Sequence, residues 1–155
     1  MRKLGFEVLF LAVFLAMLCV SPGAFAQTSG RCGNNVTYVL DDNGVLTISG
    51  TGAITSHPWV AGDVIRVVIG NGVTSIGNCA FSGCSSLTSV TIPDGVTSIG
   101  DQAFYNCTSL STVTIPENVT QIGIDAFRGC SGLTSVTIPD SVTRLGCVHF
   151  MNAST

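Results

Sequence analysis

The stretch "VTSIGDQAFYNCTSLSTVTIPEN", residues Val96 to Asn118, decides the fold because the chain repeats it in register. The 23 residues before it and the 23 after it align without gaps, which gives units 73–95, 96–118 and 119–141. Twelve of the 23 columns are identical in all three units, in the pattern V-T-x-I-G-x-x-A-F-x-x-C-x-x-L-x-x-V-T-I-P-x-x, and a partial unit follows over 142–155. A fixed period of this size is typical of solenoids.

Each unit predicts a strand, two turns and one layer of a core. Val90 and Ile92 alternate with polar neighbours, which indicates a strand with one buried face, and Pro93 ends it. A second extended piece over 96–99 ends at Gly100, where a sharp turn is easy. We therefore expect a mainly β solenoid in which like residues stack on like at about 4.7–4.9 Å. The expected layer is Leu87, Val90, Ile92, Val96, Ile99, Ala103, Phe104 and Cys107.

Residues 1–26 resemble a secretory signal peptide. Arg2 and Lys3 precede an apolar run over 8–20, and small residues at Ala24 and Ala26 suit a signal peptidase. The run is short for a membrane span, although an uncleaved anchor is the alternative. We expect an exported protein that begins at Gln27 and has no membrane insertion after signal cleavage.

Residues 27–63 predict a cap, and 64–155 the solenoid. The sequence "VTYVL-DDNG-VLTIS", Val36 to Ser49, is typical of a β-hairpin with a turn rich in Asp, Asn and Gly. A hairpin over Val36–Ile48, laid across the first coil, would cover the exposed core and strand edge at that end. At the opposite end, 148–155 must form a cap, pack on another chain or fray.

Composition and charge exclude several functions. Without the signal segment the chain has four arginines, no lysine and eight acids, a formal charge of −4, which argues against nucleic acid as a partner. His57 and His149 are the only histidines of the sequence, and neither belongs to a catalytic or metal-binding pattern. We expect no enzyme activity, no cofactor and no metal.

The cysteines divide into two groups. Three of them share one repeat column, 23 residues apart, and we interpret them as a structural ladder of small buried side chains whose thiols can donate to backbone carbonyls. Disulfides or a metal site are the alternatives for this column. The ladder consists of Cys84, Cys107 and Cys130, whereas Cys32, Cys79 and Cys147 occupy other positions, and any of these three could pair.

The pattern "IGxxAFxxCxxLxxVTIPxxVTxIG" resembles the BspA-like class of leucine-rich repeats. The segment "RCGNNVTYVLDDNGVLTISGTGAI", followed by His57, Pro58 and Trp59, resembles the leader that precedes such arrays in exported proteins. The resemblance covers nearly all of residues 31–150. It implies a right-handed leucine-rich-repeat solenoid, secreted or at the cell surface, that binds host, matrix or other cell-surface macromolecules as an adhesin. The family offers no catalytic residues to carry over.

Candidate binding residues come from columns that we expect to face solvent. Hydroxyls and acids recur beside the repeated strand, and an aromatic and an arginine share one variable column with Ser82. The set is Ser89, Thr91, Asp94, Tyr105, Thr112, Thr114, Glu117, Arg128, Ser135, Thr137 and Asp140. The alternative function is a structural or truncated surface-protein remnant with no ligand. Ice binding by Thr-x-Thr rows and glycan binding are further alternatives.

Overall fold

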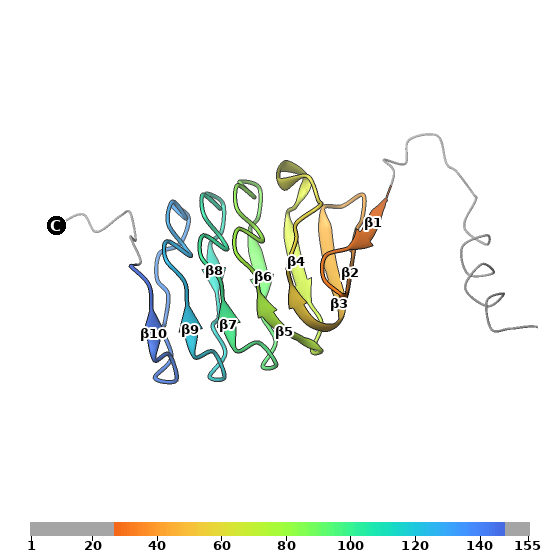
Figure 1. Ribbon diagram of the computed structural model, residues 1–155. Helices are drawn as coiled ribbons and strands as arrows, with labels where there is room; N and C mark the ends of the chain where they lie inside the picture. Colours follow the sequence, from red (N-terminus) through yellow and green to blue (C-terminus); the bar gives the residue numbers. More distant parts are fainter. Residues whose placement is uncertain (1–26, 148–155) are drawn as a thin grey trace, which may run out of the picture.

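The computed structural model describes residues 27–147, and both the expected signal peptide and the expected behaviour of 148–155 lie outside the described residues. The described chain forms a stack of coils that runs from the hairpin end to β10 (Figure 1). The strands are β1 (Thr28–Arg31), β2 (Asn35–Leu40), β3 (Val45–Ile54), β4 (Arg66–Ile69), β5 (Val73–Ile76), β6 (Ser89–Thr91), β7 (Ser98–Ile99), β8 (Thr112–Val113), β9 (Gln121–Ile122) and β10 (Arg144–Leu145). Among these residues the one helical element is the 3₁₀ turn η1 (Ala61–Asp63).

The strands build two sheets that share β3. The first sheet has the order β1-β2-β3-β4-β6-β8, and the second has the order β3-β5-β7-β9-β10. From β3 onward all neighbours are parallel, and Ser75 pairs with Ser98 and Ser98 with Gln121, which is one 23-residue step each time. The repeat period of the sequence is therefore the length of one coil, and the expected mainly β solenoid is confirmed.

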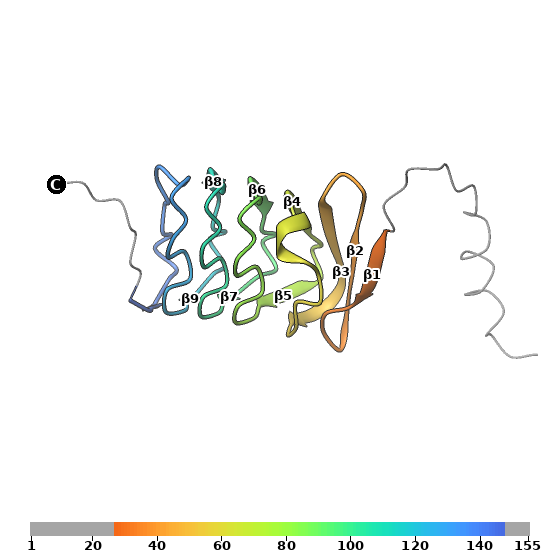
Figure 2. The same ribbon diagram turned by 90° about the horizontal axis from the view of Figure 1, so that it is seen from above.

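The N-terminal hairpin forms at the expected end of the solenoid. Strands β2 and β3 are antiparallel, with Leu40 opposite Leu46. Strand β3 also pairs in parallel with β4 and β5, so it covers the strand edge at this end and serves as the first rung of both sheets. Gly50 and Gly52, both with φ near +108°, let β3 bend from one sheet into the other. The cap extends the solenoid in register, and Figure 2 shows it at one end of the stack.

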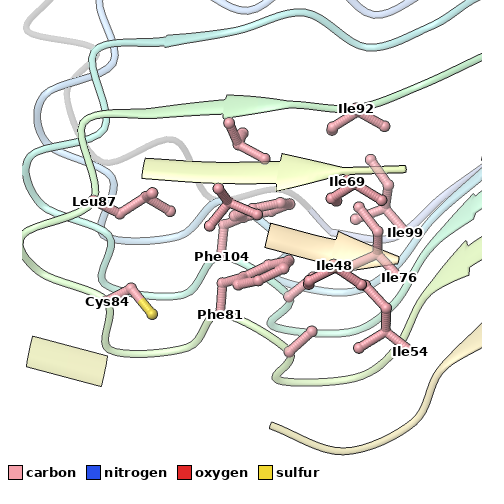
Figure 3. Packing of buried hydrophobic residues seen from close by; sticks show 14 of the residues in the cluster. Ile48, Ile54, Ile69, Ile76, Phe81, Cys84, Leu87, Ile92, Ile99 and Phe104 are labelled. Atoms are coloured by element: carbon pink, nitrogen blue, oxygen red, sulfur yellow. The ribbon is translucent and has the colours of Figure 1, made fainter. Parts of the chain in front are cut away.

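The core is a column of layers in which like residues lie above one another. All eight residues of the expected layer are buried, which confirms the interpretation of the pattern. Phe81, Phe104 and Phe127 stack with centroids 5.2 and 5.3 Å apart, and Figure 3 shows the first two rings one above the other. Trp59 stacks on Phe81 at 5.5 Å, and Tyr38 meets Trp59 edge-on. The leader segment therefore closes the aromatic column at its N-terminal end.

Side-chain ladders on the surface reinforce the stack. The Thr97 and Thr120 hydroxyls each donate to the carbonyl one coil earlier, at 3.3 Å. Asn78 Oδ1 accepts the Asp101 N–H at 2.9 Å, and Asp101 Oδ1 accepts the Ile124 N–H at 2.7 Å. Because the Ile124 side chain has no hydrogen-bond acceptor, this second ladder ends at the third unit.

The third unit corrects one expectation. The segment 135–138 repeats the strand pattern of β6 and β8 but is not a strand. Its apolar residues Val136 and Ile138 are half-buried, whereas Val90 and Ile92 in the first unit are buried. Within the described residues no following coil covers this side of the third unit. Segment 135–138 therefore gains less stability by forming a strand than the same segment does in the earlier units.

Candidate binding surface

The outward side chains of the first sheet form a continuous surface, which we call the strand face. In register, Ser89 lies opposite Thr112; Ser89 precedes the buried Val90, and Thr112 precedes the half-buried Val113. Ser89 is half-buried and the other hydroxyl residues are exposed. The residues predicted for this face are Ser89, Thr91, Thr112, Thr114, Ser135 and Thr137. Because 135–138 is not a strand, the last two extend the rows by repeat position and not by pairing.

A row of acids borders the strand face where each strand ends. Asp94, Glu117 and Asp140 are all exposed. Each follows a proline whose carbonyl accepts the N–H three residues on, for example Pro93 O from the Val96 N–H at 3.1 Å. This β-turn places the acid at its first central position, where the side chain points to solvent. The turns therefore give the strand face one negatively charged edge.

Tyr105 and Arg128 do not lie with the other predicted residues. Both belong to the turns that follow the second sheet, outside either sheet. Tyr105 is half-buried, and the Arg128 guanidinium bonds Asp125 Oδ2 at 3.2 Å within its own turn. The structure thus separates these two from the strand face, and the arginine has a structural partner.

The strand face also includes residues that the sequence analysis missed. Arg66 pairs with Ser89 and Val68 with Thr91, so the rows continue toward the cap as an arginine and a valine. Val68 and Val39 are each 37% exposed and flank Thr47 in the register. The sequence could have placed Arg66 and Val68 on this face, because residues 64–72 match the second half of a repeat unit. The face is therefore hydroxyl-rich over the repeats and more apolar and basic near the cap.

The cysteine column lies inside the solenoid. Cys84, Cys107 and Cys130 are buried, and the Cys107 and Cys130 thiols donate to the Phe81 and Phe104 carbonyls at 3.1 and 3.0 Å. Burial raises the pKa of Cys84 to about 12, and the hydrogen bond with the neighbouring thiol together with burial raises the pKa of Cys107. The hydrogen bond with Cys107 lowers the pKa of Cys130. Cys84 and Cys107, whose pKa values are raised, stay protonated at neutral pH, so these two are poor nucleophiles and poor metal ligands.

The remaining cysteines are free thiols as well. Cys32 is buried, with its pKa raised to about 11 by burial, while Cys79 is half-buried and Cys147 is exposed. Cys79 and Cys147 lie in the first and fourth units, so three coil steps of about 4.8 Å separate them, more than a disulfide can bridge. Pairing between these two within one chain is excluded.

Residues 27–147 were searched for metal-holding clusters and for helices that could cross a membrane. Between residues 27 and 147 no group of three or more His, Cys, Asp or Glu side chains is placed to hold a metal ion. In the same range no helix has the length and apolar character needed to cross a bilayer. His57 is exposed, and His149 lies outside the described residues.

Comparison with known proteins gives a family and a fold. Residues 61–155 match the sequence profile described as "BspA type Leucine rich repeat region (6 copies)". No curated protein matches the sequence.

Solved structures give the same fold. The chain is 29% identical to a leucine-rich repeat protein from Eubacterium ventriosum, with a TM-score of 0.61 over 78% of this chain and 40% of that one. It is 25% identical to the T. pallidum leucine-rich repeat protein, with a TM-score of 0.60 over 76% of this chain and 64% of that one. A leucine-rich repeat protein from Bacteroides ovatus, 24% identical with a TM-score of 0.59, supports the fold. The chain spans less than two thirds of the length of each of these proteins.

Proposed function

The chain belongs to the BspA-type leucine-rich repeat family, and from this premise we propose that it is an exported, non-enzymatic interaction module with adhesin-like binding to host, matrix or cell-surface macromolecules. Leucine-rich repeats serve as protein-interaction scaffolds, and solenoids meet partners through extended faces. Proteins, or other macromolecules at a cell surface, are the partner class that this premise supports.

The observation that carries the proposal is the strand face. Its backbone is fixed from both sides, since β6 pairs with β4 and with β8, so its outward side chains keep a regular spacing. A preorganised surface loses little conformational entropy on binding. Exposed hydroxyls, with Arg66 and the half-exposed Val68 near the cap, give the mixed polar and apolar character of transient protein interfaces.

The test is a binding screen with variants that alter the strand face alone. Residues 27–155 would be immobilised and exposed to purified extracellular-matrix and cell-surface proteins at physiological salt. Thr91→Arg with Thr114→Arg places bulky charges on the face without touching the core, and Ser85→Arg with Ser109→Arg makes the same change at exposed positions of the turns. We expect the first pair to weaken binding at least about tenfold and the second pair to leave it unchanged.

Two results would contradict the proposal. Equal loss of binding in both double variants would mean that the strand face is not the contact surface. No partner for a protein that circular dichroism shows to be folded would favour the alternative function, a structural or truncated remnant without a ligand. Export is tested separately, because the mass of the secreted protein should correspond to a chain that begins at Gln27.

A further inference from the structure

A pocket opens at the cap end of the solenoid, away from the strand face. It has a volume of about 520 Å³ and lies between the β2–β3 turn and the segment 58–63, which contains η1. Figure 2 shows the yellow turn of η1 beside the hairpin end of the stack. We call this feature the cap pocket. It is built by the leader segment, and Ser86 is its one lining residue from the repeated units.

The two sides of the cap pocket are tied together by backbone contacts. The Gly44 carbonyl, in the hairpin turn, accepts the N–H groups of Ile65 and Arg66 at 2.8 and 3.1 Å. A Cβ at Gly44 would lie 2.7 Å from the Asp63 carbonyl oxygen, so this glycine permits the close approach. Asp41 Oδ1 accepts the N–H groups of Asn43 and Val45, each at 2.9 Å, which fixes the turn. The pocket is therefore preformed.

Two apolar residues of the pocket wall are unusually exposed to solvent. Val60 is 65% exposed and Ile65 is 45% exposed, and both line the pocket. Tyr38 and Trp59 also line it, but each is 7% exposed. Trp59 stacks on Phe81 and meets Tyr38 edge-on, so its ring is held inside the aromatic column. A ligand such as a sugar, which stacks on an open ring face, does not suit this arrangement.

The polar lining is acidic. Asp41, Asp42 and Asp63 border the cap pocket, and no Lys, Arg or His is among its lining residues. The Asp41 carboxylate stabilises the hairpin turn, which leaves Asp42 and Asp63 as the carboxylates for a ligand. The three are not placed to hold a metal ion. The matching ligand is an organic cation that carries an apolar stem.

We propose that the cap pocket binds an arginine or lysine side chain of a partner polypeptide. The alkyl stem would pack on Val60 and Ile65, and the cationic group would reach Asp42 and Asp63 at the rim. Basic side chains bind in this way because the stem gains from burial while the charged end keeps polar partners. The site is separate from the strand face and gives the chain a second contact with a macromolecule.

The test uses the peptide acetyl-Leu-Arg-Leu-amide as probe and the neutral analogue with citrulline in place of arginine as its control. Trp59 is the single tryptophan of the sequence, so its fluorescence and its indole N–H resonance report on the pocket without labels. Asp42→Asn with Asp63→Asn removes both rim charges but keeps the side-chain shapes. Asp94→Asn with Glu117→Gln makes an equal charge change beside the strand face.

We expect the arginine peptide to shift the Trp59 resonance and the citrulline peptide to shift it much less. The affinity should fall roughly two- to thirtyfold in the Asp42/Asp63 variant, as expected for the loss of two exposed ion pairs. It should stay within a factor of two, roughly, in the Asp94/Glu117 variant, because those charges are on a different edge. The strand-face variants should also bind the peptide normally.

Three outcomes would overturn the proposal. One is no shift of the Trp59 resonance at peptide concentrations up to about 10 mM, which corresponds to negligible affinity. Another is equal binding of the arginine and citrulline peptides, because the charge would then not be recognised. The third is an equal loss of affinity in both double variants, which would mean that the net charge of the protein, and not the cap pocket, attracts the peptide.

Discussion

Phe104→Ala tests the layered core at its most central position. The Phe104 ring is fully buried between Phe81 and Phe127, at 5.2 and 5.3 Å between centroids, with interplanar angles of 20° and 2°. Truncation removes a ring that fills one layer and touches the layers on both sides. The neighbouring coils are held by parallel strands and cannot close the gap without breaking their own register. We therefore expect a cavity that persists in the variant.

The expected loss in the free energy of unfolding of Phe104→Ala follows from these contacts. Phenylalanine to alanine in a core costs about 3–5 kcal/mol, and an aromatic pair contributes about 0.5–1.5 kcal/mol beyond its buried area. Because Phe104 has two stacked partners, we expect a loss at the upper end of the range, about 4–5 kcal/mol. Since a single domain has a total free energy of unfolding of about 5–15 kcal/mol, the variant should be close to unfolding at 37 °C.

The assay is urea denaturation of residues 27–155 followed by circular dichroism, with Phe104→Leu as the matched control. Leucine keeps most of the apolar volume but loses both stacks, so we expect a smaller loss of about 1–3 kcal/mol. A loss below about 1 kcal/mol for Phe104→Ala would refute the reasoning, because it would mean that the column is loosely packed or that the coils relax independently.

Four more predictions concern other parts of the fold. Ile124→Asn should stabilise the protein by about 0.5–1.5 kcal/mol in the same assay, since its side chain would offer an acceptor to the fourth coil, and destabilisation would contradict the ladder. Mass spectrometry after iodoacetamide at pH 8 should find two thiols labelled quickly, Cys79 and Cys147, and rapid labelling of buried Cys84 would contradict the described burial. Burial raises the pKa of Cys84 from 9.0 to about 12, so its contribution to stability should be complete below pH 9 and decline between about pH 9 and 12, which thermal melts across that range would detect. Gly50→Ala should destabilise by more than about 1 kcal/mol in urea denaturation, because φ is +108° and the new Cβ would overlap a β2 carbonyl oxygen, and an unchanged midpoint would contradict the described bend of β3.

The repeated units were predictable because each layer depends on the same local chemistry. Val90, Ile92 and Phe104 are buried as their columns indicate, since a coil that repeats the previous one meets identical neighbours. The outward direction of Thr91 follows from strand alternation alone, and this residue is exposed. Periodicity therefore gives both the core and the strand face without any knowledge of long-range contacts.

The features that escaped prediction depend on neighbours that the pattern does not contain. Arg128 occupies a variable column, and its pairing with Asp125 depends on the turn geometry, which an alignment of the units does not show. The cap pocket arises where the hairpin turn meets the segment after it, where the Ile65 and Arg66 N–H groups donate to the Gly44 carbonyl. Segment 135–138 has the strand pattern but lacks a covering coil among the described residues, so its periodicity alone was misleading.

Amide hydrogen exchange of residues 27–155, resolved by NMR, tests most directly that stacked coils form a rigid strand face. The N–H groups that bond across β4, β6 and β8 should exchange at least about a thousandfold more slowly than in an unfolded chain. Those of 135–138 should exchange fast, since that segment has no strand pairing. Fast exchange throughout β6 (Ser89–Thr91) would contradict the account, because a face that opens freely could not serve as a preorganised binding surface.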